Sequence, residues 1–252
     1  MRPKLICQSI SLMRRKSKQS LKIRLCRLFR VPMSTIIELQ NVSFAYQKNK
    51  TEYEPLILES VNLSIEKNSL VFFVGESGVG KSSLLRLING LESPASGDIY
   101  FHGENMNALN PCLLRRKISL LQQVPVMFPV TVEENLNLSP GASKVNSDEK
   151  KEILNVLGLN ENSLGKIATE LSIGQAQRVA FVRCLMNQPE VILLDEPTAS
   201  LDQKNKMKLF ETIMKYTKEG KMTVLWVTHD LSLIEEYPFK KFRLKDKRIY
   251  EI

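Results

Sequence analysis

The segment Leu70-Val-Phe-Phe-Val-Gly-Glu-Ser-Gly-Val-Gly-Lys-Ser-Ser-Leu-Leu85 decides the fold of this chain. It begins with an apolar run of strand length, continues into a glycine-rich turn and ends in an apolar-periodic stretch typical of a helix. The spacing G-x-x-x-x-G-K-[ST] is matched by Gly75, Gly80, Lys81 and Ser82. Because a strand precedes this pattern and a helix follows it, the segment predicts a turn that binds a phosphate chain.

The residue types of this turn explain why it suits phosphate. Glycines allow successive backbone N–H groups to point into one concavity, and the helix that follows adds the positive end of its dipole. Lys81 can place a charge near the β and γ phosphates, and the Ser82 hydroxyl can ligate the Mg2+ that bridges them. The alternative, a glycine turn with a solvated lysine, is less favoured because of the flanking strand and helix.

Two further apolar runs end in polar residues. The run Pro189-Glu-Val-Ile-Leu-Leu-Asp-Glu196 indicates a buried parallel strand, and ligands of open α/β sheets bind at the carboxyl ends of such strands. We expect Asp195 to hold Mg2+ and Glu196 to polarise the attacking water; the alternative is a carboxylate that caps the next helix. Residues 223–228 predict another buried strand, and His229 ends it at the same sheet edge, where a packing role is the alternative.

The remaining elements indicate an α/β fold with two additions. Strands predicted over residues 36–46 and 63–66 precede the phosphate-loop strand, which favours antiparallel strands packed against a mostly parallel core. The capping-box pattern Thr131-Val-Glu-Glu134 predicts a helix start, within a helical insertion over about residues 110–170. Another helix begins after Ser172, and this start is either an ordinary cap or a second anion site.

The positive charge of the chain is concentrated at its beginning. The net charge is +9, but ten of the 36 Lys and Arg residues lie in residues 1–32, which contain no Asp or Glu. The remaining residues carry 26 basic and 27 acidic side chains, so a basic surface for nucleic acid is not expected in the globular part.

Residues 1–32 therefore form a basic N-terminal extension with three interpretations. In the first, Met33 is the true start of the protein and the upstream residues are a mis-called start. In the second, residues 21–30 form a basic amphipathic segment that lies on an anionic membrane. In the third, the extension is an organelle-targeting segment. A secretory signal is not favoured because polar residues interrupt the apolar run over residues 5–13.

The cysteines and the hydropathy exclude several classes. Cys7, Cys26, Cys112 and Cys184 lie far apart without a C-x-x-C pair, which argues against a disulfide framework and a zinc site. No apolar run approaches the length of about 18 residues that a membrane span requires. If the chain serves a membrane process, we expect another chain to cross the bilayer.

Taken together, these segments resemble the nucleotide-binding subunit of ATP-binding-cassette (ABC) transporters over residues 35–250. The resemblance implies a P-loop NTPase core with an antiparallel β subdomain and a helical insertion, within one domain over residues 33–252. It rests on six ordered motifs: the phosphate loop, the Q-loop at Gln123, the signature Leu171-Ser-Ile-Gly-Gln175, the Walker B strand Val191–Glu196, the D-loop Ala199–Asp202 and the switch histidine His229.

The resemblance also implies the residues of the site. The catalytic residues would be Glu196 as general base, together with His229, Gln123 and Lys81, and the ligands of Mg2+ would be Ser82, Gln123 and Asp195. Tyr46 looks like the aromatic that stacks on adenine, although from spacing alone a packing role is favoured. ATP would be bound by Tyr46, Gly75, Glu76, Ser77, Gly78, Val79, Gly80, Lys81, Ser82, Ser83, Ser172, Gly174 and Gln175.

The family implies a mechanism in which two copies of the domain meet head to tail. Each ATP would lie between the phosphate loop of one copy and the signature of the other, where Ser172 and Gly174 would act on the γ phosphate. Closure on ATP would drive a multi-spanning permease subunit at the cytoplasmic face of the inner membrane, with residues 127–128 near its coupling helices. A homodimer and no nucleic-acid partner are therefore expected.

One position departs from the family pattern. The signature reads Ser-Ile-Gly where Ser-Gly-Gly is usual, so Ile173 places a β-branched side chain at a helix start that approaches phosphate. We expect turnover that is retained but slowed.

Within the family, the chain looks like the small ATPases of bacterial iron or metal efflux, and phosphate-importer ATPases are similar. Two alternatives of other classes are a soluble ABC ATPase of translation or DNA repair and a nucleotide-binding regulator without turnover.

Overall fold

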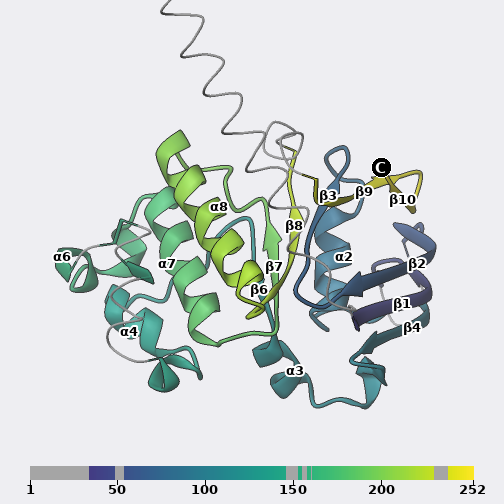
Figure 1. The fold of residues 1–252 in the computed structure, drawn as a ribbon, viewed down its shortest axis with the longest axis horizontal. Coiled ribbons are helices and arrows are strands. Elements are labelled where there is room, and N and C mark those ends of the chain that lie inside the picture. The colour runs from purple at the N-terminus through teal and green to yellow at the C-terminus, as the bar shows by residue number, and fades with distance from the viewer. Residues whose placement is uncertain (1–33, 49–53, 146–152, 155–157, 160, 230–237) are drawn as a thin grey trace, which may run out of the picture.

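The fold combines two sheets with two groups of helices (Figure 1). The computed structural model describes residues 34–48, 54–145, 153–154, 158–159, 161–229 and 238–252. The N-terminal extension, residues 1–32, lies outside the described residues, so the interpretations of that segment stay predictions.

A six-stranded sheet forms the core, in the order β10-β9-β3-β8-β7-β6. Neighbouring strands from β9 to β6 are parallel, and only β10 is antiparallel to its neighbour, so the predicted mostly parallel core is confirmed. The strands are β3 (Leu70–Val74), β6 (Ile118–Leu121), β7 (Val191–Asp195), β8 (Thr223–Val227), β9 (Lys240–Lys245) and β10 (Arg248–Glu251).

A four-stranded antiparallel sheet packs against one face of this core. It has the order β2-β1-β4-β5, and its strands are β1 (Thr35–Phe44), β2 (Leu58–Glu66), β4 (Ser96–Phe101) and β5 (Glu104–Asn105). Helix α2 (Lys81–Ile88) shares one apolar cluster with both sheets, in which Phe73 stacks on Phe242 at 5.5 Å between ring centroids. The antiparallel subdomain expected from the sequence is thus confirmed.

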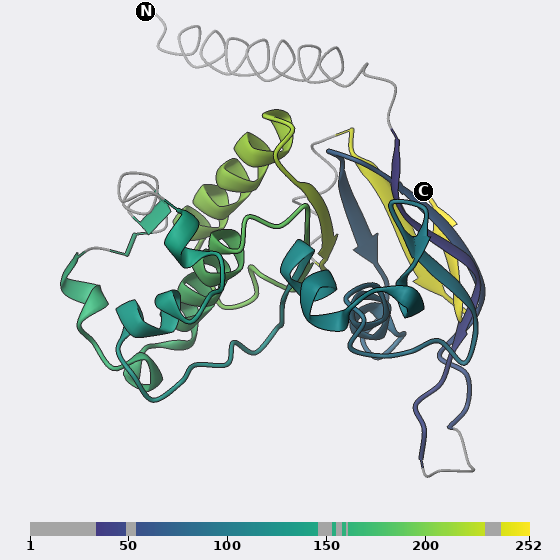
Figure 2. The ribbon, with the colours of Figure 1, turned by 90° about the horizontal axis from the view of Figure 1, so that it is seen from below.

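Two long helices cover the other face of the core sheet. They are α7 (Ile173–Met186) and α8 (Gln203–Lys218), and Figure 2 shows them on the side of the molecule opposite the antiparallel sheet. The fully buried Trp226 of β8 packs between Phe72 of β3 and Phe210 of α8. Because both faces of its parallel strands are covered, the core reads as continuous apolar runs in the sequence.

The helical insertion begins later in the chain than its expected limits. Within residues 110–170, α3 (Pro111–Lys117) is followed by β6, which pairs with β7 in the core sheet. The insertion's own helices follow this strand, and the first of them begins with the predicted capping box of Thr131 and Glu134. They are α4 (Val132–Asn137), α6 (Glu161–Leu164) and the 3-10 turns η2 (Ala142–Lys144) and η3 (Ala168–Glu170), whereas the 3-10 turn η1 (Met106–Ala108) precedes α3.

No helix in the described part of the chain combines the length and the apolarity that crossing a membrane requires.

Candidate functional site

The glycine-rich turn lies between the end of β3 and the start of α2, as its sequence predicts. Gly80 is the residue before α2 and has a φ of 105°, which side chains rarely adopt. A Cβ at Gly80 would also lie 2.5 Å from Cγ2 of Ile57, so a larger residue is excluded by contact as well as by conformation. Gly78 has a φ of 79° and open space around it. The turn therefore needs glycine at both positions.

The Lys81 ammonium lies inside this turn. Its Nζ donates to the backbone carbonyls of Gly75, at 2.8 Å, and Glu76, at 2.7 Å. Only 8% of Lys81 is exposed, so these bonds compensate for the removal of the charge from water. The turn thus encloses a cation next to the backbone N–H groups at the start of α2.

Two carboxylates lie at the carboxyl end of β7, where Asp195 is the last residue of the strand and Glu196 follows it. Asp195 accepts a hydrogen bond from the Ser82 side chain. Burial raises the pKa of the Asp195 carboxyl above its usual value, the hydrogen bond from Ser82 opposes this, and the charge of Glu196 adds to the increase. The site therefore concentrates negative charge beside a hydroxyl group, an arrangement that a cation would stabilise.

Glu196 has a strained backbone and a histidine partner. Its φ is 49°, in the left-handed region, and its backbone N–H donates to Val227 O at 3.0 Å. Its Oε2 lies 2.7 Å from Nδ1 of His229, which follows β8. The Glu196 side chain is 10% exposed and that of His229 is 70% exposed, so the pair joins the buried sheet edge to the surface.

These groups line one cavity of about 450 Å3. Most of the residues that the sequence predicts for nucleotide, Mg2+ and catalysis lie on its wall, and Ile57 is a lining residue that sequence reasoning missed. Because Ile57 follows a loop without a motif, no local signal could have indicated it. The lining residues are Tyr46, Ile57, Ser77, Gly78, Gly80, Lys81, Ser82, Ser83, Gln123, Asp195, Glu196 and His229.

The Tyr46 side chain is held by contacts with helix α2. Its hydroxyl lies 3.0 Å from Oγ of Ser83, and Nη1 of Arg86 donates to it at 3.4 Å. Its ring makes an edge contact with Phe44 at 4.9 Å between centroids. Tyr46 therefore both packs against Phe44 and lies on the cavity wall. Arg86, which contacts the Tyr46 hydroxyl, is a second residue that sequence reasoning missed.

Some predicted residues lie outside this wall. Gly75, Glu76 and Val79 belong to the turn itself but do not line the cavity, and a Cβ at Gly75 would lie 2.6 Å from Leu244 O. The three signature residues Ser172, Gly174 and Gln175 lie at the start of α7 and are not among the lining residues either.

The signature forms a capped helix start. The Ser172 side chain accepts from Gln175 N at 3.3 Å, and the Gln175 side chain accepts from Ser172 N at 3.0 Å, so the cap expected at Ser172 is a complete capping box. A Cβ at Gly174 would lie 2.8 Å from Ser200 O, so the start of α7 packs tightly against the loop after β7. Ile173 is 69% exposed, so its side chain is largely open to solvent at this helix start.

The donor set suits a magnesium phosphate rather than a transition metal. Ser82, Asp195 and Gln123 offer hydroxyl, carboxylate and amide oxygens on the wall of one cavity, and Mg2+ prefers such oxygens together with substrate phosphates. Among the described residues, no group of three or more His, Cys, Asp or Glu side chains could hold a metal ion by itself. The residues present therefore fit Mg2+ that arrives with a phosphate ligand.

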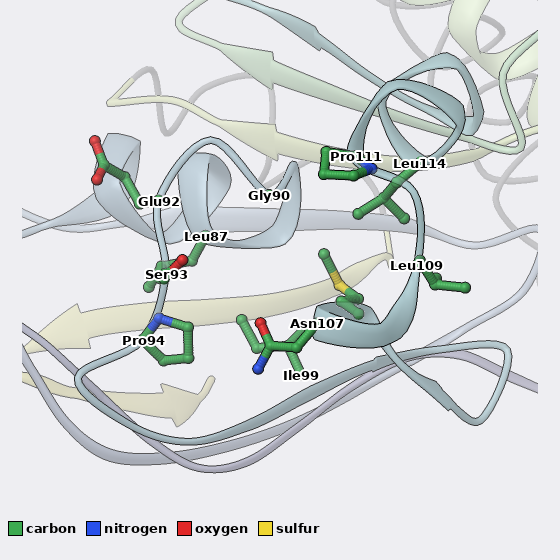
Figure 3. Close-up of a pocket in the computed structure, with 11 residues that line it drawn as sticks. Leu87, Gly90, Glu92, Ser93, Pro94, Ile99, Asn107, Leu109, Pro111 and Leu114 are labelled. Atoms are coloured by element: carbon green, nitrogen blue, oxygen red, sulfur yellow. The ribbon is translucent and has the colours of Figure 1, made fainter.

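A second cavity offers less chemistry. It has a volume of about 150 Å3 and lies between the end of α2 and the segment around α3 (Figure 3). Its wall mixes apolar side chains, such as Leu87 and Leu114, with polar ones, and Glu92 is the ionisable residue among those that line it. The larger cavity is therefore the candidate site.

Comparison with known proteins points to one family. The family described as "ABC transporter" matches residues 58–199. The chain is 36% identical over 200 residues to the "Probable iron export ATP-binding protein FetA" of Escherichia coli (strain K12), covering 78% of this chain and 86% of that protein. It is 36% identical over 209 residues to the "Methionine import ATP-binding protein MetN" of Staphylococcus haemolyticus, covering 79% of this chain and 60% of that protein.

A solved structure shows the same fold. It is the dimeric structure of a post-hydrolysis state of the ATP-binding cassette MJ0796, bound to ADP and Pi. The TM-score is 0.76 at 32% sequence identity, and the match covers 86% of this chain and 98% of the other.

Proposed function

The chain belongs to the ABC transporter family and is an ATP-hydrolysing subunit of that family; from this premise we propose that it powers transport by a separate, membrane-spanning permease. One observation carries the proposal. The phosphate turn, the carboxylates Asp195 and Glu196, and His229 line a single cavity, although they come from distant parts of the sequence. This set suits phosphoryl transfer to water.

ATP binding begins at the glycine turn. The backbone N–H groups at the start of α2 would bind the phosphate oxygens, and Lys81 would exchange its carbonyl partners, Gly75 and Glu76, for those oxygens. Tyr46 would stack on the adenine ring, since its side chain lines the cavity and its hydroxyl is held by Ser83.

Ser82, Gln123 and Asp195 would hold Mg2+. When bound with ATP, this ion neutralises the charge on the β and γ phosphate oxygens. The hydrogen bond between Ser82 and Asp195 supports the assignment, since it keeps two of the three ligands next to each other.

Glu196 would act as the general base. In this step the oxygen of a water molecule bonds to the γ phosphorus, the bond from the γ phosphorus to the bridging oxygen breaks, and Glu196 takes the water proton. His229 would orient the carboxylate through the 2.7 Å contact and reach the γ phosphate from its exposed position. The positive φ of Glu196 supports this role, since backbone strain of this kind concentrates at active sites.

The signature would complete the site of a second copy. Ser172, Gly174 and Gln175 do not line the cavity of their own chain, and they form the exposed start of a 14-residue helix. We propose a head-to-tail homodimer in which they bind the γ phosphate held by the partner copy. The similar MJ0796 cassette is a dimer in its solved structure, and this supports the proposed arrangement.

The permease would bind next to the Q-loop. Val124, Val126 and Phe128 follow Gln123 and are 74%, 59% and 48% exposed, which is unusual for three apolar side chains in one segment. Through this contact the chain would sit at the cytoplasmic face of the membrane.

As cargo we propose a metal ion that is exported, because the match to the iron-export protein covers more of that relative than the match to the methionine-import protein does.

Hydrolysis by the purified chain tests the enzymatic part of this proposal. We expect Mg2+-dependent release of phosphate from ATP and its loss, by at least about a hundredfold, in Lys81→Ala, because Lys81 supplies the charge that binds the transferred phosphate. Lys221→Ala is the matched control, since Lys221 is an exposed lysine paired with Glu219 outside the cavity. Equal rates in the two variants would contradict the assignment of the cavity.

A further inference from the structure

Helix α7 connects two surfaces of the proposed function. Its first turn is the signature, and Arg183 lies near its other end. The distance from Ser172 to Arg183 along a helix is roughly 16 Å. Because α7 runs without a break from Ile173 to Met186, a displacement at Ser172 would be carried to Arg183.

The Arg183 guanidinium binds the segment that follows the Q-loop. Its Nη2 donates to Val126 O at 2.7 Å, and its central carbon lies 5.8 Å from the centroid of the Phe128 ring. Its Nη1 donates to Oδ1 of Asn135 in α4 at 3.4 Å. A partly buried cation with three partners is positioned by all of them, and in turn it restricts each of them.

Asn135 fastens the same segment from the other side. It is fully buried, accepts from Phe128 N at 3.0 Å and donates to the carbonyls of Phe128, at 3.0 Å, and Val130, at 3.3 Å. Arg183 and Asn135 together hold the backbone of residues 126–130, while the side chains of Val126 and Phe128 stay largely exposed.

The segment is also tied to α7 where it begins. The buried Gln177 donates through Nε2 to Gln122 O at 3.4 Å, next to the cavity residue Gln123. Residues 122–128 therefore contact α7 at both of their ends. Their backbone is fixed to the helix and Met127 packs against the buried core, whereas the side chains of Val124, Val126 and Phe128 are exposed.

We propose that Arg183 is a positioning residue that fixes the apolar surface of Val124, Val126 and Phe128 to helix α7, so that movement of the signature is transmitted to the permease. This inference rests on the proposed function, because that function assigns the surface to the permease and the signature to the ATP of the partner copy. Arg183 touches neither nucleotide nor permease in this arrangement; it acts through the loop.

Two substitutions of Arg183 distinguish the role of its charge from the role of its paired hydrogen-bond donors. Arg183→Met keeps most of the length and removes the charge, and Arg183→Lys keeps a charge but has one donor group in place of the fork. The matched control is Lys221→Met, because Lys221 also lies over an aromatic ring, 5.5 Å from the centroid of Tyr216, but at the far end of α8.

The first measurement is hydrogen exchange of the isolated chain. In Arg183→Met we expect two amides to exchange about tenfold faster, that of Phe128, which donates to Asn135 Oδ1 at 3.0 Å, and that of Val130, which donates to Phe128 O at 2.8 Å. In Arg183→Lys we expect a smaller increase, and in the control the wild-type rate. We expect the basal ATP hydrolysis and the melting temperature of the isolated Arg183→Met chain to stay close to those of the wild type.

The second measurement uses the complex that is purified with the membrane partner. Here we expect Arg183→Met to lose the stimulation of ATP hydrolysis by the partner, with kcat reduced and KM for ATP unchanged, and Arg183→Lys to restore part of it. Wild-type exchange in Arg183→Met would overturn the proposal, and so would full stimulation in that variant. A collapse of melting temperature and basal hydrolysis would also overturn it, because Arg183 would then be a general packing residue.

Failure of the proposed function gives a different result. In that case the wild-type chain itself hydrolyses no ATP or shows no stimulation, whereas failure of this inference leaves the wild type active and the variant indistinguishable from it.

Discussion

The imidazole Nδ1 of His229 lies 2.7 Å from Oε2 of Glu196. These residues follow the neighbouring strands β8 and β7, so the sheet places them side by side although they lie far apart in the chain. A histidine that orients a carboxylate at the wall of a phosphate-binding cavity is the arrangement expected of a base and its positioning group. The proposed catalytic step depends on this pair.

Glu196→Gln tests the base directly. The amide keeps the size and a hydrogen-bonding oxygen but cannot take a proton, so we expect steady hydrolysis to fall by about a hundredfold or more and ATP to remain bound. Phosphate release and the binding of a fluorescent ATP analogue measure the two effects separately. Undiminished hydrolysis in this variant would remove the general-base assignment.

Tyr46→Ala tests the proposed adenine contact. Loss of base stacking costs about 1–3 kcal/mol, so we expect the affinity for ATP to fall by roughly 5-fold to 150-fold. Tyr46→Phe keeps the ring and loses the contacts with Ser83 and Arg86, and it should weaken binding much less. Titration with ATP and with inorganic triphosphate is the measurement. If both ligands lose the same affinity in Tyr46→Ala, stacking on adenine is not its role.

The signature offers a pair of opposite predictions. Ile173→Gly should increase ATP hydrolysis in the assembled complex, because the exposed side chain of Ile173 lies at the helix start that we assign to the partner's phosphate. Gly174→Ala should reduce it strongly, because a Cβ at this position would lie 2.8 Å from Ser200 O and displace the helix start. An unchanged rate in Ile173→Gly would show that this side chain does not slow turnover.

A surface cluster predicts a pH-dependent contribution to stability. Burial raises the pKa of Glu190, but hydrogen bonds from His102, at 2.7 Å, and from Lys117 outweigh it, so the pKa lies below its usual value. A carboxylate with a lowered pKa stabilises the fold above its unfolded pKa, and this stabilisation is lost as the pH falls through the folded pKa.

Glu190→Gln should therefore destabilise the protein at pH 7 by about 0.5 kcal/mol, a small value because the side chain is one-third exposed, and by less at a pH below the folded pKa of Glu190. Thermal melts at the two pH values measure this. Glu219→Gln is the control, since Glu219 pairs at the surface with the exposed Lys221 and not with His102 or Lys117. A difference from wild type that is the same at both pH values would contradict the electrostatic origin.

Much of the fold could be predicted because its signals are local. The strand–turn–helix at Gly80, the buried strand that ends at Asp195, the capping box at Thr131 and the helix start after Ser172 each depend on neighbouring residues. The steric and hydrogen-bonding requirements of such elements are met by residues that are close in the sequence, so a local pattern reveals them. The structure confirms these elements.

The features that could not be predicted depend on distant contacts. The hydrogen bond between Tyr46 and Ser83 and that between Arg183 and Val126 join residues that are brought together only in the packed fold. The hairpin of β9 and β10 was also missed, since its many charged residues indicate surface rather than an edge of the core sheet. Likewise, the pairing of β6 with β7 within the expected helical insertion follows from the sheet and not from a local pattern.

The most direct test of the central claim is to purify this chain from its native cells in mild detergent and to identify what remains bound by mass spectrometry. We expect a multi-spanning membrane protein as the main stoichiometric partner, lost when Val126 and Phe128 are changed to Asp. Ribosomal or DNA-repair proteins in its place, with no membrane protein, would contradict the transporter assignment and support a soluble ATPase.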